Sequence, residues 1–190
     1  MAEKEAEYFQ DFSFFRNVVA ERHQHARVLG KDRPVMAYYC DFVPEELVDA
    51  AGFIPVRMLG TKKPIHLADK YLQSNVCSFA RSSLELALDG TCRYLSGIII
   101  PHSCDVITKM HDLWAYRAPY PDFCHYLWYP HKANDPSARS AFLGEVGRLK
   151  DALEVCTGKA IEENTLRESI VRYNANRRLL RQLYEFRKQN

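Results

Sequence analysis

The sequence predicts an α/β protein: an open parallel four-stranded sheet flanked by helices, of the Rossmann or flavodoxin-like type, with a C-terminal helical pair. Short apolar runs alternate with helical stretches, which is the order of a sheet whose strands are joined by crossover helices. The clearest strand is the run Gly-Ile-Ile-Ile-Pro at 97–101. A continuous apolar run between turn residues is typical of a parallel strand that is covered on both faces.

The first third of the chain predicts one long helix followed by a strand–helix–strand unit. Residues 3–28 are expected to be helical, because aromatic and apolar side chains repeat there at helical spacing. The apolar run at 35–39 predicts a buried strand, and a second strand is expected at 54–58. Between them Pro44 opens a short helix, since proline suits a helix start and the two glutamates after it complement the helix dipole.

The middle of the chain continues the alternation of helices and strands. A short helix is expected at 67–72 and a longer one at 77–88, which Asp-Gly closes. After the strand at 97–101, a helix at 105–117 stops before Pro119, because proline cannot continue it. The last strand is expected at 124–129.

Two long helices are expected at the C-terminal end. The first begins near residue 137 and ends at Thr157-Gly158, and Thr165 with Glu168 predicts a capping box for the second. This change in pattern divides the chain into an α/β domain at 1–135, which would carry the site, and a helical extension at 136–190 that would lead into a second domain.

Composition limits the classes of function. The 190 residues are 47% hydrophobic, which allows a buried core, and the net charge of +2 gives no sign of nucleic-acid binding. No apolar run reaches the roughly 18 residues of a membrane span, and the polar N-terminus does not resemble a secretory signal. We therefore expect a cytoplasmic protein whose six cysteines are thiols or metal ligands, because disulfides are rare in that compartment.

Three cysteines lie where a parallel sheet places its ligands. Cys40 follows the first strand, Cys104 follows the strand at 97–101, and Cys77 opens a helix. Ligands gather at the carboxyl ends of parallel strands, and helix N-termini favour the thiolate, which is the form that binds iron. On spacing alone, inert buried thiols are the more frequent explanation.

Five stretches of the chain match one known family in order. The three longest are Y-Y-C-D-F-V-P-E-E-L-V-D-A-A-G-F-I-P-V-R at 38–57, A-D-K-Y-L-Q-S-N-V-C-S-F-A-R-S-S-L-E at 68–85 and Y-L-S-G-I-I-I-P-H-S-C-D-V-I-T-K-M-H-D-L-W at 94–114. Shorter matches cover 149–158 and 169–180. Together they resemble the N-terminal part of the iron–sulfur component of the 2-hydroxyacyl-CoA dehydratase and benzoyl-CoA reductase family, the D-component of 2-hydroxyglutaryl-CoA dehydratase.

The resemblance implies a 4Fe–4S cluster held by three cysteines. The motif C-S-F-A-R-S maps onto Cys77 and the motif P-H-S-C-D onto Cys104, so these two are the implied cofactor-binding and metal-ligating residues. In the family the third cysteine comes from a second domain, which would begin near the point where this chain ends. We expect the chain to be a fragment. The alternatives are a ligand from a partner, or substitution by Cys40 or Cys124.

The implied activity is that of a lyase. Family members remove water from a 2-hydroxyacyl-CoA thioester through a ketyl radical made by one-electron reduction, an activity that a truncated chain alone would lack. The implied partners are the acyl-CoA substrate, a related second subunit in a heterodimer, and an ATP-dependent activator that donates the electron. Two alternatives stay open: a benzoyl-CoA reductase-type subunit, and a non-catalytic scaffold or binding subunit with the same fold.

Two further residues are candidate catalytic groups. Asp41 could position a proton or a substrate hydroxyl, although an Asx-type turn after the strand explains it as well. His102 could hydrogen-bond a cluster sulfide or a substrate oxygen, with an ordinary loop histidine as the alternative. Arg81 and Lys109 could meet CoA phosphates, or they could simply be solvated.

The remaining cysteines have plainer interpretations. Cys92 and Cys156 are interpreted as structural thiols, the latter because it lies on an apolar helix stripe. An irregularly spaced mononuclear zinc site is a further alternative. Its four ligands would be His102, Cys104, Cys124 and His125.

Overall fold

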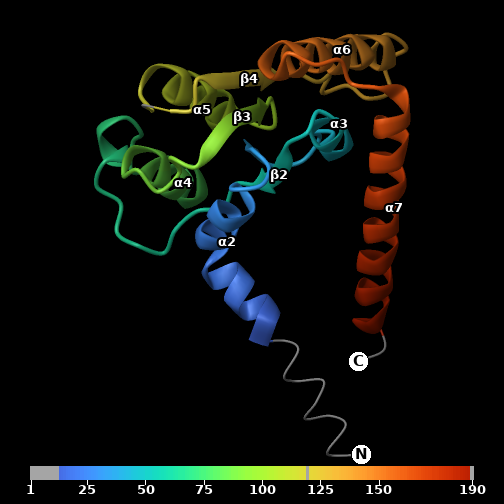
Figure 1. The fold of residues 1–190 in the computed structure, drawn as a ribbon. Coiled ribbons are helices and arrows are strands. Elements are labelled where there is room, and N and C mark those ends of the chain that lie inside the picture. The colour runs from blue at the N-terminus through green and yellow to red at the C-terminus, as the bar shows by residue number, and fades with distance from the viewer. Residues whose placement is uncertain (1–12, 119, 189–190) are drawn as a thin grey trace, which may run out of the picture.

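The computed structural model describes residues 13–118 and 120–188, and it confirms the predicted α/β fold (Figure 1). Four parallel strands form one sheet in the order β2-β1-β3-β4. The strands are β1 (Val35–Tyr38), β2 (Ile54–Arg57), β3 (Leu95–Pro101) and β4 (Phe123–Leu127). All four lie within about two residues of their expected positions.

Helices cover the sheet and extend beyond it. They are α2 (Arg22–Leu29), α3 (Glu45–Ala50), α4 (Ser78–Leu88), α5 (Asp105–Tyr116), α6 (Ala138–Thr157) and α7 (Glu163–Phe186), with a short 3-10 helix, η1, at Ala68–Lys70. Within the part of the chain that the structure describes, none of these helices is long and apolar enough to cross a membrane.

The expected N-terminal helix is interrupted. Residues 1–12 of that prediction lie outside the described residues, and the rest forms a helical segment at 13–20 and then α2. Glu21 separates them with φ −106° and ψ 24°. Helical backbone hydrogen bonds still join the Glu21 amide to Asn17 at 2.8 Å and the His25 amide to Glu21 at 3.0 Å. The predicted helix is therefore confirmed at 13–20 and in α2, with an interruption of one residue.

The two faces of the sheet bury different helices. Val35 and Ala37 of β1 pack in the cluster that contains α4 and α5, whereas Met36 points to the opposite cluster with α3 and α6. This alternation follows from the two-residue period of a strand. The sheet is tight at Gly97, where a Cβ would lie 2.6 Å from the Met36 sulfur, so glycine is needed at that position.

The last helix docks on α3. Asp49 of α3 is buried, and its Oδ2 accepts a 2.7 Å hydrogen bond from the Ser169 hydroxyl of α7. Beyond this contact α7 extends along one side of the molecule (Figure 1). The predicted capping box is wrong, because α7 begins at Glu163 with Glu162 as its N-cap. The chain is fixed before that point by the Ile161 amide, which donates to Glu154 at 2.7 Å.

The strand order changes direction between β1 and β3. From β1 the chain turns outward to β2, and it then crosses back to place β3 on the other side of β1. The connections after β1 and β3 therefore leave in opposite directions, which is the arrangement at which open α/β sheets bind ligands. Cys40 follows β1 at the carboxyl edge of the sheet, and Cys104 follows β3.

Candidate functional site

The loop after β1 has an unusual backbone. Cys40 and Phe42 have positive φ angles of 54° and 68°, a left-handed conformation that non-glycine residues rarely adopt. The loop is anchored by Tyr39, whose buried hydroxyl donates to Ser83 at 3.1 Å and accepts from the Trp114 indole at 3.0 Å. Strained residues held by a rigid support are frequent at functional sites.

Asp41 points away from the buried core. Its side chain is 72% exposed and pairs with Arg57, at the end of β2, at 3.0 Å. Solvent screens such an exposed pair, so this contact contributes little stability. The carboxylate stays accessible at the carboxyl edge, and its catalytic role stays a prediction.

The loop after β3 carries His102 and Cys104. The His102 amide donates to the Leu127 carbonyl of β4 at 2.9 Å, which fixes the start of the loop. Cys104 is the N-cap residue of α5, and its thiol is exposed. Its carbonyl accepts the first helical hydrogen bond, from the Thr108 amide at 2.9 Å.

Cys77 occupies the equivalent position on α4. It is the N-cap residue of that helix, and its thiol is also exposed. Helices α4 and α5 pack against each other on the same face of the sheet, and both begin at its carboxyl edge. The two thiols thus belong to neighbouring helix N-termini at one edge of the sheet.

Arg81 has a structural role near Cys77. Its guanidinium pairs with Asp69 of η1 and donates to the Ser74 carbonyl at 3.4 Å. These contacts hold the segment that leads into Cys77. Lys109, the other candidate for CoA phosphates, is exposed on α5.

Aromatic rings surround His102. Its ring centroid lies 4.5 Å from that of His131 and 6.4 Å from that of Tyr129. Phe42 closes the group, with its ring 4.3 Å from Tyr129. The Nδ1 atom of His102 is buried and has no hydrogen-bond partner among the described residues. This atom therefore has an unused capacity for a hydrogen bond.

Sequence analysis did not identify Tyr129 as a candidate. Burial raises the pKa of Tyr129 above its usual value. The negative charge that Cys40 and Cys104 carry when ionised raises this pKa further. The Tyr129 hydroxyl therefore stays protonated at neutral pH. Its place just after β4, at the same sheet edge, is the signal that could have identified it.

An apolar recess opens beside Tyr129. It has a volume of about 240 Å³ and lies between the loop after β1, the segment after β4 and the start of α6. Its lining residues are Phe42, Tyr129, Pro130, Ala133, Ala138, Arg139 and Phe142.

The zinc alternative is wrong. Within residues 13–118 and 120–188, no three histidine, cysteine or acidic side chains come together in a way that could hold a metal ion. Cys124 and His125 are consecutive in β4, so their side chains point to opposite faces of the sheet. Burial raises the pKa of the Cys124 thiol to about 12, which also disfavours it as a replacement cluster ligand.

The two cysteines interpreted as structural differ from each other. Cys92 is fully buried, and burial raises the pKa of its thiol to about 12, as expected of an inert thiol. Cys156 is exposed, so the interpretation of its helix position as a buried stripe was wrong. The buried face of α6 is set instead by Leu149 and Leu153.

Comparisons with known proteins assign the family. Residues 40–190 match the family described as 2-hydroxyglutaryl-CoA dehydratase, D-component. A benzoyl-CoA reductase subunit of Thauera aromatica is 31% identical over 82% of this chain and 40% of its own length. The beta subunit of lactoyl-CoA dehydratase of Anaerotignum propionicum is 31% identical over 74% of this chain and 37% of its own.

A third relative gives the same result. The beta subunit of (R)-2-hydroxyglutaryl-CoA dehydratase of Acidaminococcus fermentans is 31% identical over 72% of this chain and 36% of its own length. The chain thus spans at most about two fifths of these relatives. Because the family match covers most of the chain, this protein belongs to the 2-hydroxyglutaryl-CoA dehydratase D-component family, as its motifs suggested.

Proposed function

We propose that this chain contributes Cys77 and Cys104 as ligands of a 4Fe–4S cluster in a 2-hydroxyacyl-CoA dehydratase. The supporting observation is the pair of exposed thiols on the N-caps of α4 and α5, two helices that pack together and open at one sheet edge. The donor chemistry fits, because cluster iron is bound by cysteine side chains.

The described residues supply only part of the ligand set. Since no third side chain of a suitable type joins these thiols within the described ranges, the remaining cysteine would come from elsewhere. We propose that it lies outside the described residues, in further polypeptide or in a partner subunit. Cys40, half-buried in the loop after β1, is the alternative within this chain.

The chain's own residues would bind the substrate and handle its protons. A bound cluster would supply one-electron transfer and a Lewis-acidic iron. Tyr129 would donate a hydrogen bond to a substrate oxygen, because its raised pKa keeps the hydroxyl protonated. His102 Nδ1 would bond the departing hydroxyl or the thioester carbonyl. Asp41 would take up a proton or hold the 2-hydroxyl after leaving Arg57.

The relatives suggest the partners. Each of the three relatives is named as one subunit of an enzyme that acts on a CoA thioester. We infer an acyl-CoA substrate and a related second subunit for this chain. The one-electron chemistry would also need an ATP-dependent activator as electron donor.

A benzoyl-CoA reductase-type subunit is the second candidate. The benzoyl-CoA reductase relative matches a larger share of this chain than the two dehydratase relatives described above. The recess lined by Phe42, Tyr129 and Phe142 also suits an aromatic ring, because aromatic side chains pack favourably around one. A scaffold subunit that binds no cluster remains the alternative if the cysteines prove dispensable.

Anaerobic purification with the partner subunit tests the cluster. We expect iron and acid-labile sulfide in the wild-type complex, and a loss of at least half of both in Cys77→Ser and in Cys104→Ser. The matched control is Cys156→Ser, which removes another exposed thiol and should keep the full content. A wild-type complex without iron, or unchanged iron in both ligand variants, would contradict the proposal.

A further inference from the structure

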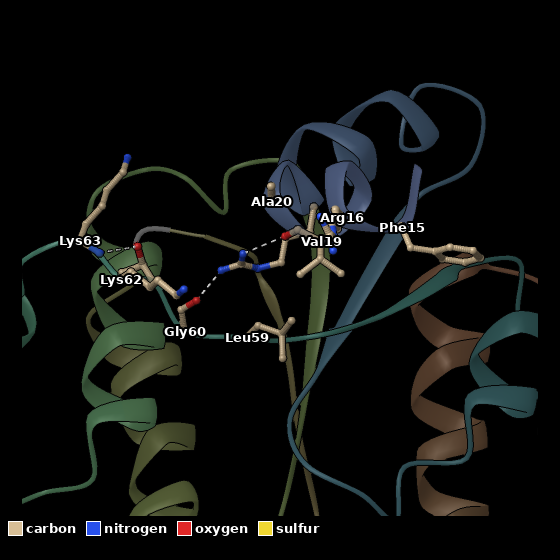
Figure 2. Close-up of a pocket in the computed structure, with 10 residues that line it drawn as sticks. Phe15, Arg16, Val19, Ala20, Leu59, Gly60, Lys62 and Lys63 are labelled. Atoms are coloured by element: carbon tan, nitrogen blue, oxygen red, sulfur yellow. Dashed lines mark hydrogen bonds between the residues drawn. The ribbon is translucent and has the colours of Figure 1, made fainter. Parts of the chain in front are cut away.

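A second cleft lies beside β2, at the same sheet edge as the cysteines. It has a volume of about 830 Å³, within the usual range for small-molecule sites. One wall is the helical segment 13–20 with Arg22, and the other is the loop 59–63 that follows β2 (Figure 2). Figure 2 shows Val19 and Leu59 pointing toward each other between these walls. These side chains, 60% and 42% exposed, give the cleft an apolar floor.

The lining is cationic. Four of its ten residues are basic and none is acidic, although the whole chain has nearly equal numbers of both. The basic residues are Arg16, Arg22, Lys62 and Lys63. Within the described part of the chain none of them pairs with a carboxylate, whereas nearby Arg57 and Arg81 each do. Unneutralised positive charge around an apolar floor favours an anion with a flat or apolar body.

The cleft is firmly joined to the helix that carries Cys77. The Arg22 guanidinium donates to the Gly60 carbonyl and so ties the two walls together. Gly60 lies against the first turns of α4, where a Cβ would come 2.0 Å from the Ser82 hydroxyl. A larger residue at this position would push the Ser82 side chain aside. Because the cleft and the start of α4 lie at the same sheet edge, we infer that one extended ligand can contact both.

We propose that this cleft binds the phosphorylated adenosine end of a coenzyme A thioester. The inference rests on the proposed function, which places the thioester end at Cys77 and Cys104. The 3′-phosphate and the diphosphate of coenzyme A carry several negative charges, which the lysines and arginines neutralise. The adenine ring occupies the apolar floor between Val19 and Leu59. A free adenine nucleotide such as ADP carries the same adenine ring and diphosphate, so it is the alternative ligand.

Titration calorimetry with the full 190-residue chain, purified aerobically and free of iron, tests the site. The titrants are coenzyme A, dephospho-coenzyme A, ADP and inorganic phosphate. The test variant Lys62→Gln/Lys63→Gln alters two side chains at the surface, so it should fold. The control Lys31→Gln/Lys159→Gln makes the same charge change at the opposite, amino edge of the sheet, where both lysines are exposed.

We expect coenzyme A to bind the wild type and the control equally, and the test variant about tenfold more weakly, because charged hydrogen bonds are lost. Dephospho-coenzyme A should bind more weakly than coenzyme A. Equal affinity of ADP and coenzyme A would overturn the assignment in favour of a general nucleotide site. No binding, or an unchanged affinity in the test variant, would overturn the site itself. These outcomes do not depend on iron, so they separate this inference from the cluster proposal.

Discussion

The side chains at the carboxyl edge depend on a strained loop. Cys40 and Phe42 both lie in the left-handed region, on either side of Asp41. A non-glycine residue pays about 1–2 kcal/mol for this conformation, so the surrounding contacts must over-determine it. The anchor is Tyr39, fully buried between Ser83 and Trp114. The strain keeps Phe42 against Tyr129 at the mouth of the apolar recess.

A pair of substitutions at Phe42 measures this strain. Phe42→Gly and Phe42→Ala both remove the ring, but only glycine adopts a φ of 68° freely. We expect the glycine variant to be more stable by about 1 kcal/mol in urea unfolding. At the control Leu59, which has no positive φ, alanine should be the more stable. A more stable alanine variant at Phe42 would contradict the left-handed backbone.

Motifs predicted some of these residues better than others. Cys77 and Cys104 follow from local motifs at helix starts, and the structure confirms those helix starts. Tyr129 was missed because its contact with Phe42 depends on tertiary structure and not on any spacing in the sequence. The pairing of Asp41 with Arg57 likewise joins two different strand ends.

At the scale of elements, one buried carboxylate joins three segments. Asp49 of α3 accepts hydrogen bonds from Ser169 and Arg172 of α7 and from Arg33 in the turn before β1. Burial alone would raise the pKa of Asp49, but the hydrogen bonds from Ser169 and Arg33 lower it below its usual value. The ionised carboxylate therefore holds α7 on α3.

Asp49→Asn should weaken the contact between α3 and α7. We expect a loss of about 2 kcal/mol in the free energy of unfolding at pH 7, since hydrogen bonds to a charged group are lost. The folded pKa is lowered, so the contribution of Asp49 is complete above the unfolded value of about 3.9 and is lost as the pH falls through the folded value. The gap between wild type and variant, measured by urea unfolding, should shrink below about pH 4.

The exposed aspartate of α6 provides the control. Asp151→Asn makes the same chemical change without a buried network and should leave the stability unchanged. If Asp49→Asn is as stable as the wild type at pH 7, the contact between α3 and α7 contributes nothing to the free energy of unfolding. If wild type and variant differ in this free energy by the same amount at about pH 7 and about pH 3, the carboxylate charge does not matter.

Periodicity predicted the elements but not their exact limits. Apolar runs located all four strands, because buried parallel strands exclude polar residues on both faces. The capping-box pattern placed the start of α7 too late, since contacts made by Glu154 with Ile161 decide where the chain turns. The sequence pattern also did not predict the interruption at Glu21, where the Arg22 side chain donates a hydrogen bond to the Val19 carbonyl.

At the scale of the whole molecule, the strand order determines the function we propose. The predicted fold class allowed two strand orders, and the observed order β2-β1-β3-β4 is the flavodoxin-like one. Because β1 pairs with β3, this order places the loop with Cys40 beside the loop with Cys104. It also places the helix start with Cys77 and the cationic cleft at the same edge. The division into parts at 1–135 and 136–190 stays a prediction.

The most direct test of this account is an intramolecular cross-link between thiols. A short bis-maleimide is added to the reduced, iron-free chain, and linked peptides are identified by mass spectrometry. The account predicts a link between Cys77 and Cys104, and none from either to Cys156, whose end of α6 lies at the opposite edge of the sheet. Absence of the first link, or equally frequent links to Cys156, would show that the two proposed ligands do not converge.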